Sequence, residues 1–366
     1  MNQHHGAIRA LILGSFCAAL AACDTSLAEL GAYPRQLVDR DGGLAPAEDA
    51  VAVAPAQDAQ VGTSDSAPPL GPSQVLPSCL PDNCVTNARL SVPGEHCYEV
   101  NAHAPGDASA PYRVAMAPEI YVNFTTRVPG DGAQYLRSFG VLIVAGQVLH
   151  DMRLYTHSDP SPADVHASPT PTLPPGARLI SSWGPGLDTV SLHPELGIAL
   201  APGAWYTLQA HYSNSITGRE LDDKSGFRVC TTSTPPAHLV SFSKLGADVA
   251  GITARGQCTP QHDGEIFLLA GLPRMNVLGQ RISLSVRRAG GEDQRLFDRV
   301  FAFDEQSPTL LNGARTQPGD TLTTECRYRE QAQGGPGIRD ELCDLYVLHW
   351  PARALRSGSD GELCRD

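Results

Sequence analysis

The sequence is poor in basic residues, in aromatic residues and in long hydrophobic runs. Its 27 lysines and arginines stand against 39 aspartates and glutamates, giving a net charge of −12, and no basic cluster occurs. The chain therefore lacks the electrostatic footprint of a nucleic-acid-binding protein, and we expect no nucleic-acid partner. After residue 22 no apolar run reaches the roughly 20 residues that a bilayer-spanning helix needs, so we expect no membrane span there.

Several common catalytic motifs are also missing. The chain has no Gly-x-Ser-x-Gly elbow, no phosphate-binding Walker loop, no Gly-x-Gly-x-x-Gly turn and no His-Glu-x-x-His pair. These absences argue against the usual hydrolases, nucleotide-binding enzymes and zinc proteases that carry them.

The N-terminus has the pattern of a secretion signal. Arg9 precedes an uncharged apolar stretch over 10–22, which is too short to span a membrane. Leu20-Ala21-Ala22-Cys23 resembles the bacterial lipobox, whose cysteine is lipidated before cleavage. We therefore predict a signal peptide over 1–22 and a lipid on Cys23 that anchors the protein to a membrane of the cell envelope. The alternative is an ordinary signal peptide that happens to contain a cysteine.

Residues 23–78 are rich in alanine, proline, aspartate, serine and glycine. Such a segment buries too little apolar surface to offset the entropy of ordering, so we predict a disordered linker between lipid and domain. Beyond the predicted signal and Cys23, eight cysteines remain, and an even number in an exported chain suggests four disulfides. Zinc is the alternative, but no Cys-x-x-Cys pair supports it.

From residue 79 onward the sequence favours an all-β fold. Glycine and proline are abundant, with 35 and 30 residues, and short runs rich in Val, Ile, Leu and Tyr alternate with turn-rich loops. We predict two consecutive β-sandwich domains, 79–235 and 236–366, with a break near 233–238. Residues 158–177, rich in proline, are predicted to be a surface loop. The main predicted strands lie in the segments 111–116, 119–128, 137–146, 147–156, 205–214, 225–232, 238–246, 265–272, 281–288, 295–303, 321–330 and 343–350.

Three segments resemble a known family. They are GQVLHDMRLYTH with His150, WYTLQAHYSNS with His211, and a C-terminal block. That block contains Gly319-Asp320-Thr321-Leu322, Cys326-Arg327-Tyr328, Gly334-Gly335, Asp340-Glu341-Leu342-Cys343 and Tyr346 to Pro351. Together they look like the ascorbate-dependent type II copper monooxygenases, the family of peptidylglycine and dopamine β-monooxygenases, over roughly residues 97–364.

The resemblance implies two jelly-roll-like β-sandwich domains with one copper in each. In the family, three histidines hold the first copper, which supplies an electron. A His-x-His pair and a methionine hold the second copper, which activates dioxygen. The first set falls here on His150, Asp151 and His211, and the second set falls on Arg274, Asn276 and Leu342.

The departures from the family pattern change the expected chemistry. Arg274 brings a permanent positive charge, Asn276 is a poor copper ligand, and Leu342 has no lone pair. We therefore expect the oxygen-activating copper site to be lost, with 274 and 276 on one face of a strand. His150, Asp151 and His211 form a two-histidine, one-carboxylate set that holds divalent iron, zinc or copper in other proteins. The alternative is that both histidines are only packed or hydrogen-bonded strand residues.

The resemblance also implies the disulfide pairing Cys97–Cys230, Cys258–Cys364 and Cys326–Cys343, which leaves Cys79 with Cys84. Three functions stay open. The first is a membrane-anchored, catalytically degenerate member of the copper monooxygenase fold, holding at most one copper and binding an unknown protein or small molecule. The second is a working copper-dependent oxidoreductase that hydroxylates a small or peptide substrate. The third is a carbohydrate- or protein-binding sandwich.

Overall fold

The structure, a computed structural model, describes residues 76–80, 84–88, 90, 93–158, 163–260, 264–337 and 339–352, without the side chain of Asn312. The predicted signal peptide, Cys23, nearly all of the predicted linker and Cys364 lie outside the described residues. The described residues all belong to one compact unit, 70–366. No helix among the described residues has the length and apolar character to cross a membrane.

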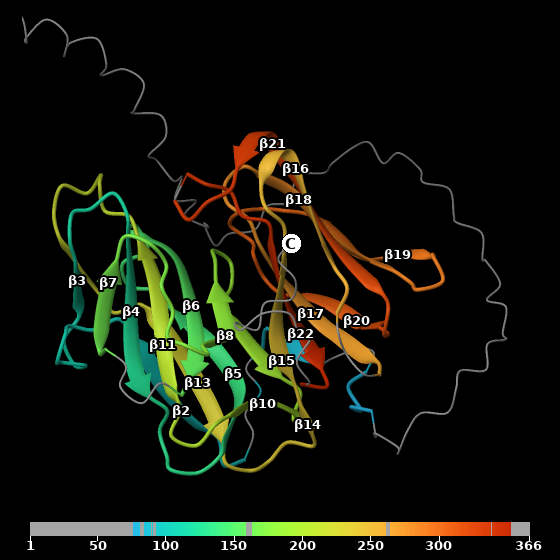
Figure 1. Cartoon of the computed structure of the whole chain (residues 1–366). Coiled ribbons are helices and arrows are strands. Elements are labelled where there is room, and N and C mark those ends of the chain that lie inside the picture. The colour runs from blue at the N-terminus through green and yellow to red at the C-terminus, as the bar shows by residue number, and fades with distance from the viewer. Residues whose placement is uncertain are drawn as a thin grey trace, which may run out of the picture. The chain divides into compact units, whose positions relative to one another are not determined.

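The described part is all-β, as the sequence predicts, and its strands form sheets that pack as sandwiches (Figure 1). A seven-stranded sheet contains β1 (Val85–Thr86), β2 (His96–Asn101), β5 (Gln134–Leu142), β9 (Thr189–Leu192), β10 (Leu196–Leu200), β13 (Gly226–Thr232) and β14 (His238–Leu239). A five-stranded sheet has the order β7 (Val165–Ser168), β4 (Ile120–Arg127), β11 (Trp205–Tyr212), β6 (Leu149–His157) and β8 (Arg178–Trp183). A short ribbon pairs β3 (Tyr112–Val114) with β12 (Leu221–Asp223).

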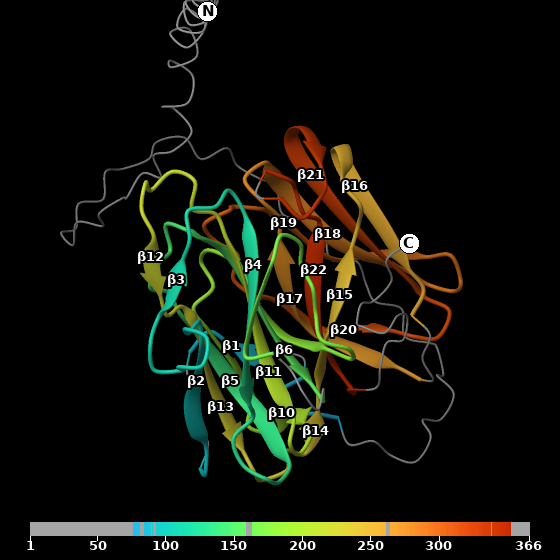
Figure 2. The same cartoon turned by 60° about the vertical axis from the view of Figure 1, so that its left-hand side comes forward.

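The remaining strands form two four-stranded sheets. One has the order β15 (Ser241–Gly246), β22 (Asp344–Trp350), β17 (Ile266–Arg274) and β20 (Thr309–Thr316). The other has the order β16 (Ala250–Cys258), β21 (Thr321–Gln333), β18 (Gly279–Arg287) and β19 (Asp293–Val300), seen in orange and red in Figure 2. The chain changes from the first pair of large sheets to the second between Leu239 and Ser241, a few residues after the predicted boundary at 235/236.

Alternation along the strands builds the two cores. In β11 the even-numbered residues Tyr206, Leu208, Ala210 and Tyr212 belong to the core of the first sandwich. In β18 Ile282, Leu284 and Val286 belong to the core of the second. Side chains of a strand point alternately to its two faces, so the odd-numbered residues of β11, which include His211, lie on the other face of the five-stranded sheet.

In the sheet of β15, β22, β17 and β20, the central strand β22 is buried on both faces. Leu345 and Val347 of β22 lie in the core of the second sandwich, whereas Tyr346, Leu348 and Trp350 join the apolar cluster of the first. Every residue of β22 is buried. This double burial explains why the segment DLYVLHW is nearly continuously apolar instead of alternating, and it packs the two sandwiches against each other through an apolar layer.

One prediction about the loops is wrong. The segment 158–177 is not entirely a surface loop, because Val165–Ser168 forms β7, the edge strand that pairs with β4. The alternating pattern is short here and flanked by prolines, which disfavour a central strand but are tolerated at a sheet edge.

Candidate metal centre

Two neighbouring strands, β6 and β11, bring the predicted first-metal residues together, and β4 adds Tyr121. In the register of the five-stranded sheet, His211 of β11 lies directly opposite Asp151 of β6 on one side and opposite Tyr121 of β4 on the other. Paired residues of antiparallel strands lie on the same face of the sheet. The three side chains therefore share the face that turns away from the first sandwich's core.

His150 joins this group through a β-bulge. Strict alternation would place the adjacent residues His150 and Asp151 on opposite faces. However, His211 pairs with Asp151 while the next residue, Tyr212, pairs with Leu149, so His150 is the extra residue. A bulge of this kind re-aims a side chain. Because of the bulge, Leu149 stays buried in the core while the side chains of His150 and Asp151 both lie close to His211.

The three side chains are close enough to hold one metal ion. Their potential ligand atoms all lie within 4.8 Å of one another. Asp151 Oδ2 lies 3.2 Å from His211 Nδ1 and 3.4 Å from His150 Nδ1. His211 is only 1% exposed, and its Nε2 is buried without a hydrogen-bond partner. A buried polar nitrogen that lacks a partner is rare in proteins, so its presence beside a carboxylate and a second imidazole agrees with a ligand site.

Asp151 is held in its charged form. Burial by itself raises the pKa of Asp151, but the Arg153 guanidinium and the hydrogen bonds from His150 and His211 outweigh burial and hold that pKa well below its usual range. Arg153 Nε lies 3.5 Å from Asp151 Oδ1. The carboxylate is therefore shared between two imidazoles and one guanidinium, which lowers the negative charge it offers to a metal.

Tyr121 forms one wall of the site. Its ring stacks on the His211 imidazole with centroids 4.1 Å apart and planes 9° apart. Its hydroxyl donates to the backbone carbonyl of Pro336, in the loop that follows β21. Burial, together with the nearby Asp151 charge, raises the pKa of Tyr121 well above that of a free phenol. The Tyr121 contacts therefore fix the orientation of the His211 ring and connect it to the second sandwich.

A cavity of about 560 Å³ opens beside this cluster. Its lining on one side includes Tyr121, His150, Asp151 and His211. On the other side it is lined by loops and strand ends of the second sandwich, among them 246–249, 334–337 and 341–344. The volume is large enough for a drug-sized small molecule.

The residues at the second-metal positions form an interior network without metal ligands. Arg274 is 4% exposed and donates from Nη1 to Pro273 O and Gln306 O, both at 2.8 Å, and from Nη2 to Ser182 O of β8. Asn276 donates from Nδ2 to Asp340 O. Leu342 is half-buried and, with Arg274 and Asn276, lines a second cavity of about 20 Å³.

The sequence argument that 274 and 276 share one face of a strand is wrong in detail. Strand β17 ends at Arg274, and residues after it turn, with Gly279 N donating to Asn276 O. Glu341, which the sequence analysis did not single out, holds this turn by accepting from Asn276 N at 3.0 Å and Leu278 N at 2.7 Å. The two side chains nevertheless meet at one cavity because the turn, and not strand alternation, places them there.

The two residue sets differ in their fitness for copper. At the second set the guanidinium of Arg274 is buried, and its charge repels any cation. These residues do not fit a copper ion. At the first set two imidazoles and a carboxylate surround the unpartnered His211 Nε2. That donor set fits a divalent ion such as Cu²⁺, Zn²⁺ or Fe²⁺ better than Cu⁺, which prefers softer ligands.

The described residues contain the disulfides Cys79–Cys84, Cys97–Cys230 and Cys326–Cys343. Cys258 is disulfide-bonded too, and its expected partner Cys364 lies outside the described residues. Cys326–Cys343 joins β21 to the residue before β22 and so fixes the loop that carries Glu341 and Leu342.

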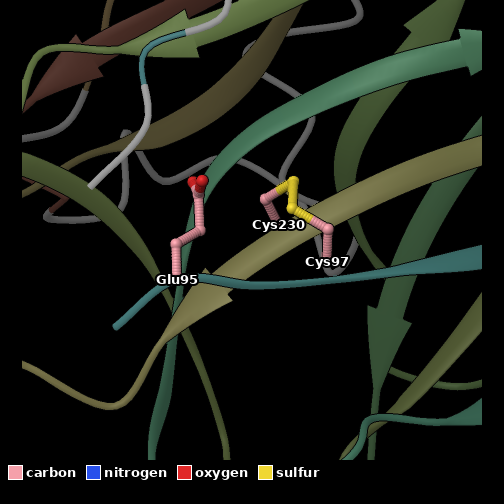
Figure 3. A group of neighbouring side chains, drawn as sticks. All are labelled: Glu95, Cys97 and Cys230. Carbon is pink, nitrogen blue, oxygen red and sulfur yellow. A yellow bond between two sulfur atoms is a disulfide. The ribbon is translucent and has the colours of Figure 1, made fainter. Parts of the chain in front are cut away.

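A second group of potential ligands does not form a metal site. Glu95 lies beside Cys97 and Cys230 (Figure 3). The two sulfurs are bonded to each other, and only a thiolate is an effective cysteine ligand for a metal.

Two further histidines are buried and hydrogen-bonded. His157 Nε2 contacts Thr207 Oγ1 at 2.9 Å, and His349 Nε2 contacts Ser243 Oγ at 2.9 Å. Neither lines the cavity of about 560 Å³. The sequence also missed Tyr121 and Arg153 as members of the site. Their types carry no signal without the strand register that places them beside His211 and Asp151.

Comparison with known proteins supports the resemblance over part of the chain. Residues 252–364 match the family model for the C-terminal domain of copper type II ascorbate-dependent monooxygenases. The mouse DBH-like monooxygenase protein 1 is 27% identical over 202 residues, covering 47% of this chain and 33% of the relative. Bovine dopamine beta-hydroxylase is 26% identical over 216 residues, covering 51% and 34%. Tyramine beta-hydroxylase of Caenorhabditis briggsae is 23% identical over 214 residues, covering 52% and 36%.

The chain thus spans about a third of the length of the curated relatives it matches. The matched segment contains the Arg274, Asn276 and Leu342 positions, the disulfide Cys326–Cys343 and most of the second sandwich. Residues 252–364 are therefore similar to the C-terminal domain of the copper type II ascorbate-dependent monooxygenases, within an all-β chain that is similar to the dopamine beta-hydroxylases at modest identity.

Proposed function

We propose that this chain is an envelope lipoprotein with the copper monooxygenase architecture that no longer activates dioxygen and that retains one divalent-metal site. The observation that carries the proposal is Arg274, a buried cation with three carbonyl acceptors at a position where the family resemblance requires a copper-binding imidazole. Without that ligand set, the chain cannot hold the copper that activates dioxygen in the family.

The retained site would be held by His150, Asp151 and His211. A divalent metal there would supply a Lewis acid or, for copper, a one-electron centre. The neighbouring side chains set the charge and the orientation of the ligands. Asp151 stays ionised beside Arg153, and Tyr121 fixes the His211 ring by stacking. The adjoining cavity of about 560 Å³ gives an unidentified small molecule or peptide segment access to the site.

The first test measures metal content and activity of the purified full-length chain after reconstitution with copper, zinc or iron. We expect at most one metal per chain, and no ascorbate-dependent hydroxylation of peptidylglycine or phenylethylamine substrates. The variant His150→Ala/His211→Ala should lose that metal, by more than about 100-fold in affinity, because outer-shell changes alone cost 10–100-fold. The matched control His166→Ala alters an exposed histidine of β7 and should keep it.

Two coppers per chain, or hydroxylation that requires ascorbate and copper, would contradict the degenerate reading and favour a working oxidoreductase. Full retention of metal by the double variant would remove the proposed site. Absence of any bound metal after all three reconstitutions would leave both histidines as structural residues.

The second test concerns the anchor. Cys23→Ala is expected to abolish incorporation of labelled palmitate in a bacterial host and to move the protein from the membrane to the soluble envelope fraction, because acyl chains supply the membrane affinity. Cys17→Ala, which changes the other cysteine of the N-terminal segment, serves as the control and should leave labelling intact. Membrane retention of unlabelled Cys23→Ala would show that something other than a lipid on this residue holds the protein.

A further inference from the structure

A small cavity of about 20 Å³ lies between the two sandwiches, where the first-metal and second-metal positions meet. Arg153, His150 and Asp151 line it from β6, and Ser182 and Trp183 from β8. Arg274, Asn276 and Leu342 line it from the second sandwich. A cavity of this size holds one water molecule or one ion of similar radius.

Two guanidinium nitrogens at this place have no hydrogen-bond partner. Arg274 Nε and Arg153 Nε are both buried and make no hydrogen bond, although Arg153 Nε forms an ion pair with Asp151 Oδ1 at 3.5 Å. The Nη atoms of Arg274 already donate to three backbone carbonyls. Each unsatisfied buried donor costs free energy, so an acceptor in the cavity would satisfy two donors at once.

The charges around the cavity do not balance. Among the described residues no carboxylate forms an ion pair with Arg274. Asp151 is the only acid in the cavity lining, and His150, His211 and Arg153 already occupy its oxygens. Burial lowers the pKa of Arg274 to about 10, so it remains cationic at neutral pH. Two guanidiniums therefore share the one carboxylate of the lining. Asp344 also acts on Arg153, but it pairs with Lys244 at 3.0 Å, and a buried charge without a close counter-charge is costly.

We propose that a small monovalent anion, of the size and charge of chloride, occupies this cavity and accepts hydrogen bonds from Arg274 Nε and Arg153 Nε. An anion supplies the missing charge as well as the missing acceptor, whereas a water supplies only the acceptor. The position that holds a cation in a working copper site would then hold an ion of opposite sign. The proposal does not depend on whether the His150 cluster binds metal.

A second arginine-lined cavity provides the contrast. Arg288, Arg295 and Arg315 line a cavity of about 370 Å³ at the open edge of the second sandwich. Each of these arginines already has a carboxylate partner, at 2.8 to 3.0 Å. Their charges are neutralised by the protein itself, so this cavity lacks the imbalance that marks the cavity beside Arg274.

The test uses the metal-free full-length chain, with bromide and chloride as probes. Crystals grown in bromide should show an anomalous-scattering peak between Arg153 and Arg274. In solution, replacing gluconate by chloride at constant ionic strength should raise the melting temperature by roughly 2–4 °C. The variant Arg274→Met should lose this halide-dependent increment, and the matched variant Arg315→Met, which changes an exposed arginine, should keep it.

The proposal would be overturned if the cavity showed no bromide density and the melting temperatures in chloride and gluconate were equal. The cavity would then hold water. A halide increment that survives in Arg274→Met would place the responsive site elsewhere. Because the crystallographic measurement is made on the unaltered chain, the proposal stays testable if Arg274→Met fails to fold.

Discussion

Replacing Asp151 by asparagine is expected to lower the free energy of unfolding by about 3–5 kcal/mol. The substitution keeps the shape of the side chain and removes its charge. Arg153, whose side chain is 18% exposed, then loses the carboxylate that lies 3.5 Å from its Nε. Arg274 lines the same small cavity and has no carboxylate of its own. The lining of this cavity would then contain two guanidiniums and no carboxylate, and breaking a buried pair from one side is the costly direction.

Chemical denaturation of metal-free protein at neutral pH and constant chloride measures this change. The control Asp248→Asn removes an exposed acid that lines the larger cavity and should change stability by less than about 0.5 kcal/mol. The double variant Asp151→Asn/Arg153→Met should recover much of the loss, because it removes the stranded cation as well. If Asp151→Asn cost no more than the control, solvent would have to be screening Arg153, and the buried pair would carry little of the stability.

Removal of the Cys97–Cys230 disulfide should have an effect of similar size. This bridge joins directly opposed residues of β2 and β13 across a sequence separation of 133. The chain-entropy estimate for so long a loop is about 5 kcal/mol. Cys97→Ser/Cys230→Ser should therefore show a strongly lowered denaturation midpoint, since the unfolded chain gains the freedom that the bridge removes.

The Cys79–Cys84 bridge offers the internal comparison. It closes a separation of only 5 residues, for which the same estimate gives about 2 kcal/mol. Urea denaturation of the two double-serine variants under identical oxidising conditions compares the losses. Equal losses would mean that native-state contacts, and not loop entropy, set the contribution of each bridge.

The all-β fold was predictable because strand patterns are local. Alternation in WYTLQAHY and the continuous apolar run in DLYVLHW each depend on a few consecutive side chains, and both segments form strands, β11 and β22. The edge strand β7 escaped prediction because its four residues lie among prolines, where local propensity is weak. Its pairing with β4 is a non-local interaction.

The sequence predicted the three candidate ligands of the metal centre but not their geometry. His150, Asp151 and His211 were chosen from the family resemblance, and the structure brings their ligand atoms within 4.8 Å. No sequence pattern reveals that His150 is the extra residue of a bulge, since a bulge depends on the pairing of β6 with β11. Tyr121 and Arg153 were missed for the same reason.

The sequence by itself determined which residue types stand at the positions that the family resemblance assigns to metals, and hence that Arg274, Asn276 and Leu342 offer no copper ligand set. It also indicated many of the strands, because alternation and turn residues act over short distances. Only the tertiary structure decided which groups surround the Arg274 guanidinium. Carbonyls of Ser182 in β8, of Gln306 and of Pro273 accept from that guanidinium, and its Nε remains without a hydrogen bond in a cavity that Arg153 also lines. Most of these groups are far from Arg274 in the chain, so their balance of charge and hydrogen bonds exists only once the two sandwiches pack together.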